Sequence, residues 1–263
     1  MKKSPISTET ARPATPPRID SLPLGKGVRL LAADPSGLLA FEKPVNTLSH
    51  PNSSRDHGKA LFRAFYDTND ECYRWVDEGR EEPRRVWLLN RLDSATSGVI
   101  LCATDPDVAA AVKDAFAGGN VRKSYFALVF GALQPPRQQW TDSLAIDRKD
   151  GQLRTRSGGG KKATAKAVLK RIFHGAPEVS LIELVPGTGR THQLRVQCAR
   201  RKLPVVGDKT YGRFRANREF ARRTGHKRLF LHCAETSLKV HVRGQTVDFR
   251  AVSLLPEAFE RPF

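Results

Sequence analysis

A single carboxylate, Asp93, lies where the residue types and their spacing could support chemistry. Arg91 precedes it by two residues, and a cluster rich in Ser, Thr and Gly follows at 94–98. The apolar runs 86–89 and 99–102 flank this stretch and have the composition of short buried strands. Functional residues often lie on such connections between rigid elements. Asp93 is therefore a candidate catalytic residue, although an Asp in a connection can equally be a turn former with Arg91 as its surface partner.

Two later segments add further groups that could take part in a reaction. Lys123 and Tyr125 begin a segment that alternates like a strand, and Arg195 ends the polar run 190–195. Together with Asp93 they offer one carboxylate, one phenol and one or two guanidiniums. A neighbouring arginine keeps a carboxylate ionised at neutral pH, and a tyrosine within reach can take or give a proton. Such a set can attack or stabilise charge at a sugar carbon.

Several other reaction classes have no signature in the chain. It has neither a Gly-x-Ser-x-Gly elbow nor a Gly-Lys-Ser/Thr phosphate loop, and no second acid suggests itself as the partner of Asp93 in a glycosidase pair. The four cysteines form no Cys-x-x-Cys pair, and the seven histidines show no ligand spacing. We therefore expect no metal and no cofactor, and we expect free thiols in a reducing cytoplasm.

The charge of the chain predicts a polyanionic partner. Lys and Arg total 45 against 27 Asp and Glu, a formal net charge of +18, and basic residues cluster at 148–171 and 201–228. Nucleic acid is the simplest partner, and an anionic membrane surface is a weaker alternative. No apolar run approaches the ~18 residues of a membrane span, and no secretory signal is visible at the N-terminus.

The elements that would position these residues follow from local patterns. Residues 1–26 read as a disordered Pro-rich tail, and 27–263 as a single α+β domain with a mainly antiparallel mixed sheet. The acidic segment 67–82 reads as a solvated excursion. Helical spacing is present near 60–65, 105–117 and 192–202, with Thr191 able to cap the last helix. The expected strands are 27–33, 38–41, 86–89, 99–102, 123–130, 163–172, 179–185, 229–233, 237–242 and 246–251.

From about Leu30 to Phe249 the chain resembles the Rlu-type (RluA family) pseudouridine synthases. The motifs that carry the resemblance come in the family's order: Glu-Lys-Pro at 42–44, Arg-Leu-Asp at 91–93 with Thr-Ser-Gly at 96–98, Lys-Ser-Tyr at 123–125, Gly-Arg-Thr-His-Gln-Leu-Arg-Val at 189–196, Val-Gly-Asp-Lys at 206–209 with Tyr-Gly at 211–212, and Leu-His at 231–232. The resemblance implies the family's single catalytic domain, and an enzyme that isomerises a specific uridine of ribosomal or transfer RNA to pseudouridine without a cofactor.

The resemblance also implies roles for individual residues. Asp93 would be the essential carboxylate and Arg195 its salt-bridge partner. Tyr125 would stack on the base and accept a proton, and Arg91 would fill the gap left by the flipped uridine. Enzymes that act inside folded RNA must extrude the nucleotide, and unstacked loops are the RNA regions that proteins read best, so a stem-loop target is expected. The remaining residues expected at the RNA and base-flipping site are Lys123, Arg190, His192, Gln193 and Leu231.

Three departures from the family pattern and some plainer interpretations stand beside these roles. Asn90 replaces a common His before Arg-Leu-Asp, Gln197 replaces a common His after Arg195, and no small RNA-binding module precedes the domain. Tyr125 could be core, Arg195 could pair with any local acid, and His192 could cap its helix. A non-catalytic RNA-binding protein on the same fold is the alternative function, and a nucleoside-cleaving enzyme is disfavoured by the positive charge. We expect a monomer.

Overall fold

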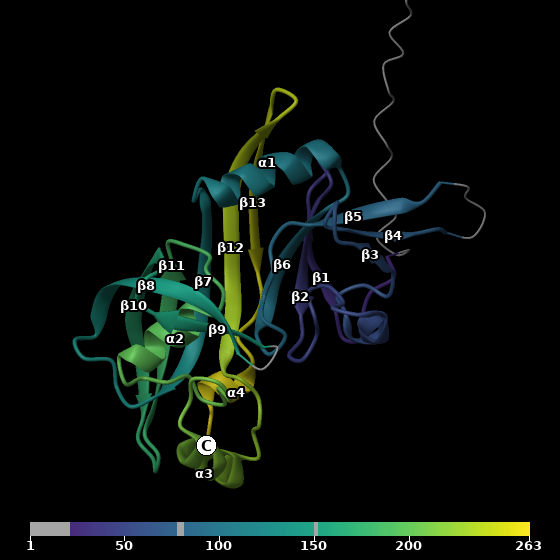
Figure 1. Cartoon of the computed structure of the whole chain (residues 1–263). Helices are drawn as coiled ribbons and strands as arrows, with labels where there is room; N and C mark the ends of the chain where they lie inside the picture. Colours follow the sequence, from purple (N-terminus) through teal and green to yellow (C-terminus); the bar gives the residue numbers. More distant parts are fainter. Residues whose placement is uncertain (1–21, 78–81, 150–151) are drawn as a thin grey trace, which may run out of the picture.

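The computed structural model describes residues 22–77, 82–149 and 152–263, which form a large mixed sheet with few helices (Figure 1). The strands are β1 Arg29–Ala33, β2 Leu38–Lys43, β3 Phe65–Asp67, β4 Cys72–Trp75, β5 Arg84–Leu88, β6 Ser97–Ala103, β7 Val121–Phe130, β8 Arg137–Lys149, β9 Gln152–Ser157, β10 Lys161–Phe173, β11 Val179–Pro186, β12 Leu231–Val242 and β13 Gln245–Val252. The helices are α1 Pro106–Ala117, α2 Gln193–Arg200, α3 Phe214–Thr224, α4 Glu257–Glu260 and the 3-10 helix η2 Ser54–Lys59.

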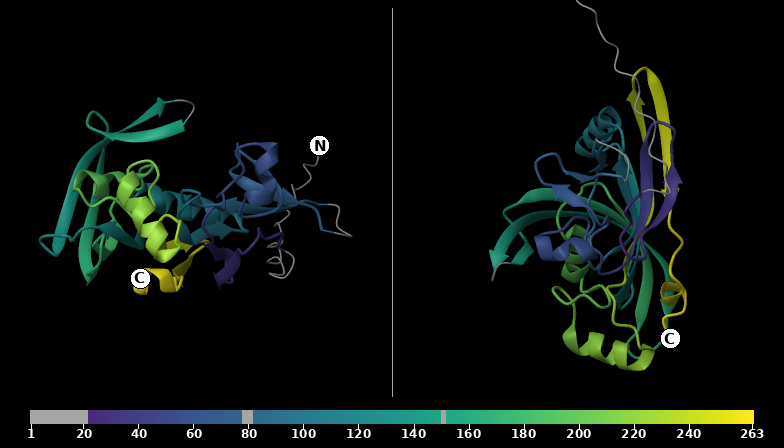
Figure 2. Two further views of the ribbon diagram at one scale, coloured as in Figure 1. Left: turned by 90° about the horizontal axis from the view of Figure 1, so that it is seen from below. Right: turned by 90° about the vertical axis from the view of Figure 1, so that its right-hand side faces the viewer.

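The strands join in one 13-stranded sheet with the order β3-β4-β5-β6-β12-β7-β11-β10-β8-β9, to which β2, β1 and β13 add at the sides. All pairs are antiparallel except β6 with β12, which confirms the predicted α+β fold with a mainly antiparallel mixed sheet. The two views of Figure 2 show that β8, β9 and β10 curl out of the plane of β12. This end of the sheet therefore forms a wall beside α2.

The strand that carries the candidate tyrosine is buried on both faces, as its apolar alternation predicted. Tyr125, Ala127 and Val129 join the largest hydrophobic cluster, which also takes in α1 and the start of α2. Leu128 and Phe130 point the other way, into a second cluster under α3 and α4. A strand held from both sides is a rigid support for the side chains at its exposed end.

Helix α1 begins and ends where its capping residues predicted. Asp105 accepts hydrogen bonds from the backbone amides of Asp107 and Val108, Pro106 fills the first helical position, and the chain leaves the helix at Gly118. Its apolar stripe packs on the sheet beneath it. This helix forms one rim of the pocket described below.

The parallel pair β6–β12 brings distant parts of the chain together. His232 pairs with Ser97 and Cys233 with Gly98, so both strands begin at the same end of the sheet. Gly98 has φ +111°, and a Cβ there would lie 2.1 Å from the Cys233 carbonyl oxygen. Glycine is therefore required for the two backbones to approach this closely. The turn that holds Asp93 comes directly before β6 and lies at this junction.

Several predicted elements differ from the structure. No helix forms near 60–65: Leu61 and Phe62 are fully buried in irregular and bridge-forming chain, because the apolar run packs against β2 from several sides. Within the segment 67–82, residues 72–75 form β4 rather than a solvated excursion, and Tyr73 on that strand is completely buried; residues 78–81 lie outside the described residues. The two strands predicted at 229–233 and 237–242 are one strand, β12.

At the N-terminus the fold begins before the predicted boundary at residue 27. Leu22 is buried, and Leu24 forms a bridge with Phe62. Residues 1–21, the rest of the predicted tail, lie outside the described residues. No helix in the described part of the chain is both long and apolar enough to cross a membrane.

Candidate active site

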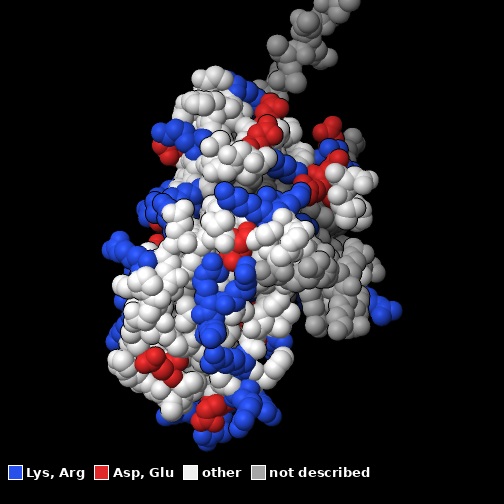
Figure 3. All heavy atoms as spheres, turned by 60° about the vertical axis from the view of Figure 1, so that its left-hand side comes forward, with Lys and Arg blue, Asp and Glu red and all other residues white. Residues whose placement is uncertain are grey.

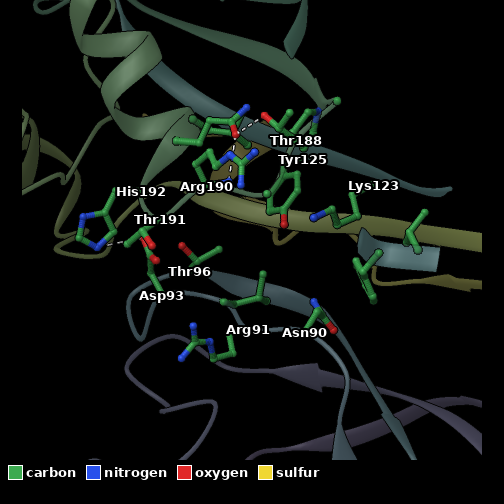
Figure 4. Close-up of a pocket in the computed structure, with 18 of the residues that line it drawn as sticks. Asn90, Arg91, Asp93, Thr96, Lys123, Tyr125, Thr188, Arg190, Thr191 and His192 are labelled. Carbon is green, nitrogen blue, oxygen red and sulfur yellow. Dashed lines mark hydrogen bonds and ion pairs between the residues drawn. The ribbon is translucent and has the colours of Figure 1, made fainter. Parts of the chain in front are cut away.

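A pocket of about 640 Å³ opens at the junction of the Asp93 turn, β7 and the segment that leads into α2. Figure 4 shows side chains from these three parts of the chain converging on it. It is lined by all nine residues that the sequence predicted for the site: Arg91, Asp93, Lys123, Tyr125, Arg190, His192, Gln193, Arg195 and Leu231.

One guanidinium joins two carboxylates at the base of the pocket. Arg195 Nη1 donates to Asp93 Oδ2 at 2.9 Å, and its Nε and Nη2 donate to the two oxygens of Asp208 at 2.8 and 2.9 Å. The Asp208 side chain is 1% exposed, whereas that of Asp93 is 26% exposed. The buried carboxylate therefore fixes the direction of the guanidinium, and the other remains accessible from the pocket.

Asp208 is held in its charged form. Burial alone would raise its pKa, but the hydrogen bonds and charge of Arg195, together with the backbone amides of Tyr211 and Thr210, outweigh burial and lower that pKa. The pKa of Arg195 is raised despite its burial, because Asp208 and then Asp93 stabilise the charged guanidinium. The ion pair predicted between Asp93 and Arg195 is present, and Asp208 is a second partner that the sequence analysis did not assign.

Side chains distant in sequence hydrogen-bond to the backbone of the Asp93 turn. Ser49 Oγ donates to the Leu92 carbonyl at 2.9 Å and accepts from the Leu92 amide at 3.0 Å. Lys43 Nζ donates to the Ser94 carbonyl at 3.0 Å. The residues on both sides of Asp93 are thus tied to the loop that follows β2, which restricts where the carboxylate can lie.

Lys43 is completely buried under this turn. Its ammonium also donates to the carbonyls of Pro44 and Thr47, so three carbonyl oxygens surround it. Burial lowers the pKa of Lys43 to about 7; the charge of Asp93 opposes this shift and that of Arg228 adds to it. The sequence signal for this role is a lysine at the end of an apolar strand, but the role itself was not predicted; Lys43 was named only within the Glu-Lys-Pro motif.

His192 lies beside Asp93 at the start of α2. Its Nε2 is 3.7 Å from Asp93 Oδ2, and its Nδ1 is 2.9 Å from the Tyr211 hydroxyl. That hydroxyl accepts the Thr155 amide at 2.8 Å and can donate its own proton to Nδ1. In the tautomer that matches this bond, Nε2 carries the imidazole proton and faces Asp93. Burial lowers the pKa of His192, although Asp93 opposes the shift, so the ring is neutral at neutral pH.

The same residue replaces the predicted cap of α2. His192 stands at the N-cap position in a left-handed conformation, with φ +52° and no side-chain capping bond. Thr191 lies one residue outside the helix, where its carbonyl accepts a hydrogen bond from Thr155. The turn is therefore shaped by contacts with β9 rather than by a capping side chain.

Tyr125 and Lys123 reach the pocket from the opposite side, on β7. Figure 4 shows the phenol and the ammonium pointing into the space that Asp93 and Thr96 line. Tyr125 is 8% exposed, and burial raises its pKa well above the usual value, so the phenol is neutral at neutral pH. Burial lowers the pKa of Lys123, whose Nζ lies 5.4 Å from the centre of the Phe116 ring.

The other predicted site residues divide into exposed and supporting positions. Arg91 and Arg190 are exposed at the mouth of the pocket, and Leu231 is a buried part of its wall. Gln193 is only 4% exposed: its amide oxygen accepts from the Thr188 hydroxyl and the Arg190 amide, and its amide nitrogen donates to the Thr164 carbonyl. Through these bonds Gln193 holds the turn that carries Arg190 in place.

Two of the departures from the family pattern, Asn90 and Gln197, make hydrogen bonds that support the fold. Asn90 Oδ1 accepts from the Leu101 amide at 2.7 Å and so fastens the chain before Asp93 to β6. Gln197 is fully buried, and its amide nitrogen donates to Asp142 at 2.7 Å. Both amides leave the contacts of Asp93 intact.

The surface around the pocket is basic. Figure 3 shows Lys and Arg side chains gathered round a small acidic centre and continuing as a band toward the lower end of the molecule. Among the described residues, no group of three or more His, Cys, Asp or Glu side chains could hold a metal ion. The four cysteines are buried and unpaired with one another.

Comparison with known proteins gives this arrangement a context. Residues 37–200 match the family model described as RNA pseudouridylate synthase. The chain is 33% identical to tRNA pseudouridine synthase C of Vibrio vulnificus over 74% of its length and 83% of that protein. It is 28% identical to ribosomal large subunit pseudouridine synthase C of the same organism, over 94% of this chain and 73% of that one.

Solved structures agree on the fold. The human RNA pseudouridylate synthase domain containing 4 protein superposes with a TM-score of 0.62 at 21% identity, covering 88% of this chain and 90% of that chain. The human domain containing 1 protein superposes with a TM-score of 0.61 at 20% identity, covering 89% and 92% of the two chains.

Proposed function

The chain belongs to the RNA pseudouridylate synthase family, and we propose that it isomerises a uridine of a structured RNA in the pocket described above, with Asp93 as the essential carboxylate. The observation that carries this assignment is the Arg195 bridge. It leaves Asp93 as the one carboxylate that both lines the pocket and is held by a guanidinium, opposite a buried phenol.

The reaction requires three events at one nucleotide. The bond between N1 of uracil and C1′ of the ribose breaks, the base rotates, and a bond forms between C5 and C1′ with loss of the C5 proton. The Asp93 oxygen that faces the pocket would either add to carbon or promote a glycal, and the geometry serves both routes. Tyr125 would stack on the uracil ring, and its phenol would pass its own proton to solvent as it takes the C5 proton. The N1 released from C1′ takes up one proton from solvent, so that the net change is one proton lost from C5 and one gained at N1.

We also propose that the uridine is flipped out of a stem-loop. Side chains inside a pocket walled by β7 and the Asp93 turn cannot contact a sugar carbon within a stacked helix, so the nucleotide must leave the helix. Extrusion of one nucleotide costs a few kcal/mol. Arg91, which is exposed and lines the pocket, would occupy the space that the base leaves. Relatives are named for transfer RNA and for ribosomal RNA, and we propose a target of one of these two classes.

A monomer in the cytoplasm completes the proposal. The four free thiols are all buried, as suits a protein that works in a reducing compartment.

The decisive experiment maps pseudouridines in total RNA from cells with and without the gene. One or a few positions should lose the modification, and the wild-type gene should restore it. The same gene carrying Asp93→Asn should not restore it, while the purified variant should keep RNA affinity within about tenfold, because phosphate contacts lie elsewhere. Unchanged modification maps, or restoration by the variant, would contradict the assignment.

A further inference from the structure

A second groove, of about 1030 Å³, lies outside the catalytic pocket along one face of α3. Phe214, Arg218, Ala221 and Arg222 form its helical wall, three and four residues apart. Lys209 and the segment 225–227 form the opposite wall. None of these residues was assigned a contact with the reacting nucleotide.

Cationic side chains surround the groove, whose lining surface is otherwise largely apolar. Arg218, Lys209 and Lys227 are exposed, and no carboxylate of the described part of the chain lies within 4 Å of their charged nitrogens. Only Arg222 is paired, with Glu219 at 2.8 Å. Helix α3 lies at the lower end of the molecule, which the basic band leading down from the catalytic face also reaches (Figures 1 and 3). A polyanion that enters the pocket can therefore continue along this surface.

An aromatic ring stands at one end of this groove. Phe214 is 65% exposed in the first turn of α3, although the helix already uses Phe220 to anchor itself among other phenylalanine rings. An exposed ring set among unpaired cations is the combination with which proteins bind single-stranded RNA, because bases stack on the ring and phosphates meet the cations.

The helix is firmly connected to the catalytic ion pairs. Asn217 Oδ1 accepts from the Gly207 amide at 2.8 Å, and its Nδ2 donates to the Asp208 carbonyl at 3.0 Å. Asp208 is the residue that directs Arg195 toward Asp93. The groove and the catalytic carboxylate therefore have fixed relative positions, set by one asparagine and one buried aspartate.

We propose that the α3 groove binds an unpaired nucleotide of the substrate RNA, outside the segment that enters the catalytic pocket. The base stacks on Phe214, and the adjoining phosphates contact Arg218, Lys209 and Lys227. The proposal rests on the proposed function in so far as the RNA is the enzyme's substrate. Such a site would extend the RNA contact surface of the catalytic domain beyond the pocket.

The test measures binding rather than turnover, so that it is independent of Asp93. Fluorescence anisotropy with the full chain would compare a labelled twelve-nucleotide oligouridylate with a blunt RNA duplex of similar charge. Phe214→Ala should weaken oligouridylate binding at least about fivefold, the lower end of the loss expected for one base–aromatic stack, and should leave duplex binding nearly unchanged. Phe214→Trp should retain the affinity.

Matched controls come from elsewhere on the surface. Phe65 on β3 is 62% exposed, so Phe65→Ala removes a similarly exposed ring from an edge strand of the sheet. Lys239→Ala removes an exposed cation from β12 and is the control for Arg218→Ala. Neither control should change binding by more than about twofold, a change of the size expected for a surface substitution. Equal losses for Phe214→Ala and Phe65→Ala would overturn the proposal, as would equal losses on oligouridylate and duplex.

Photo-crosslinking separates this proposal from the proposed function. Oligouridylate that contains thiouridine should crosslink at Phe214 in the wild-type chain and equally in Asp93→Asn. Crosslinks confined to the catalytic pocket would overturn the groove while leaving the isomerase intact. A chain that fails to form pseudouridine but crosslinks at Phe214 would refute the proposed function and leave the groove as an RNA site.

Discussion

At the scale of single residues, the geometry of the pocket depends on Arg195, because one guanidinium can donate hydrogen bonds to two carboxylates at once. Arg195 uses three of its nitrogen donors on two carboxylates, and a lysine ammonium could not span both in this planar arrangement. Asp208 accepts two of these bonds and is almost completely buried, so its contribution is to orient Arg195. The accessible carboxylate therefore pairs with a charge whose position Asp208 fixes before any RNA binds.

Tyr125→Phe isolates the phenol oxygen from the ring. The variant keeps the apolar surface that packs on the core and stacks on a base, so folding and RNA affinity should be preserved. If the phenol takes the C5 proton, kcat should fall by about 10²–10⁴-fold, the usual contribution of a positioned proton-transfer group. Single-turnover kinetics with labelled RNA would measure this.

The size of the effect of Tyr125→Phe distinguishes the two interpretations of this residue. A loss of less than about threefold in kcat, below the range of general acid–base catalysis, would make Tyr125 only a stacking and core residue. Lys123→Met on the same strand provides a comparison, because it removes the neighbouring ammonium and leaves the phenol in place.

The buried Lys43 should give the protein a distinct pH dependence of stability. Its pKa is about 7 in the fold and about 10.4 in an unfolded chain, so between these values the unfolded chain binds the extra proton. The free energy of unfolding therefore rises as pH increases from 7, by at most about 1.4 kcal/mol per pH unit. Lys43→Met lacks this titration.

Denaturant titrations at pH 7 and pH 9 would measure the difference between the wild type and Lys43→Met. The wild type should gain about 2 kcal/mol relative to the variant over this interval. Parallel pH profiles would show that Lys43 keeps its proton throughout. Lys43→Met should also reduce turnover at every pH, since the Ser94 carbonyl beside Asp93 loses its donor.

At the scale of elements, the site depends on the close approach of β6 to β12. Gly98→Ala would place a methyl group 2.1 Å from the Cys233 carbonyl oxygen and would impose φ +111° on alanine. Overpacking of this kind costs about 1–3 kcal/mol, and the backbone strain adds to it. The strands should separate and the Asp93 turn should shift, so both the melting temperature and kcat should fall.

A second glycine separates these two effects. Gly244 also has a positive φ, +77°, but a Cβ there meets nothing within 4 Å. Gly244→Ala therefore imposes strain without a clash and should lower stability less, with no loss of turnover. Similar losses of activity in the two variants would show that the β6–β12 approach does not position Asp93.

Local sequence patterns could predict the elements whose conformation is set by interactions between residues close in sequence. Helix α1 has Asp105 as its cap and a regular apolar stripe, and β7 alternates cleanly on both faces. The segment near residue 61 has helical spacing, yet its side chains pack against β2 in a non-helical conformation. This packing depends on residues distant in sequence, so local spacing could not predict it. Helix α3 escaped prediction because it buries one side chain, Phe220, among many charges.

In the site, too, the residues within local motifs could be predicted and the contacts between distant residues could not. The motifs identified Asp93, Tyr125 and Arg195 and predicted the Asp93–Arg195 pair, which the structure contains. The supporting contacts join residues whose separation in sequence carries no periodic signal, such as Ser49 with Leu92 and Thr155 with Tyr211. Asp208 was present in a motif, but its bidentate bond to Arg195 depends on a turn that no local pattern specifies.

At the scale of the whole molecule, the charge is distributed unevenly. Acidic side chains of the β3–β4 hairpin pair with nearby cations: Arg74 contacts both Asp67 and Asp70, and Lys113 on α1 contacts Glu71. Of the cations that line the α3 groove, Lys209, Arg218 and Lys227 have no carboxylate of the described residues within 4 Å, and Figure 3 shows Lys and Arg side chains gathered on the face that carries the site. An RNA approaching this face would displace condensed counterions, which makes binding sensitive to salt.

The logarithm of the association constant for oligouridylate should therefore fall linearly with the logarithm of salt concentration, by about 0.7 for each phosphate neutralised on a single strand. Asp93→Asn allows the measurement without turnover, from about 50 to 200 mM salt. If Lys209 and Arg218 each contact a phosphate, the double variant Lys209→Ala/Arg218→Ala should lower the slope by about 1.4. Lys239→Ala should leave it unchanged, since that cation lies on β12 and is paired with Asp248. A slope near zero in the wild type would mean that the basic face is not the RNA surface, and an unchanged slope in the double variant would place the phosphates elsewhere on it.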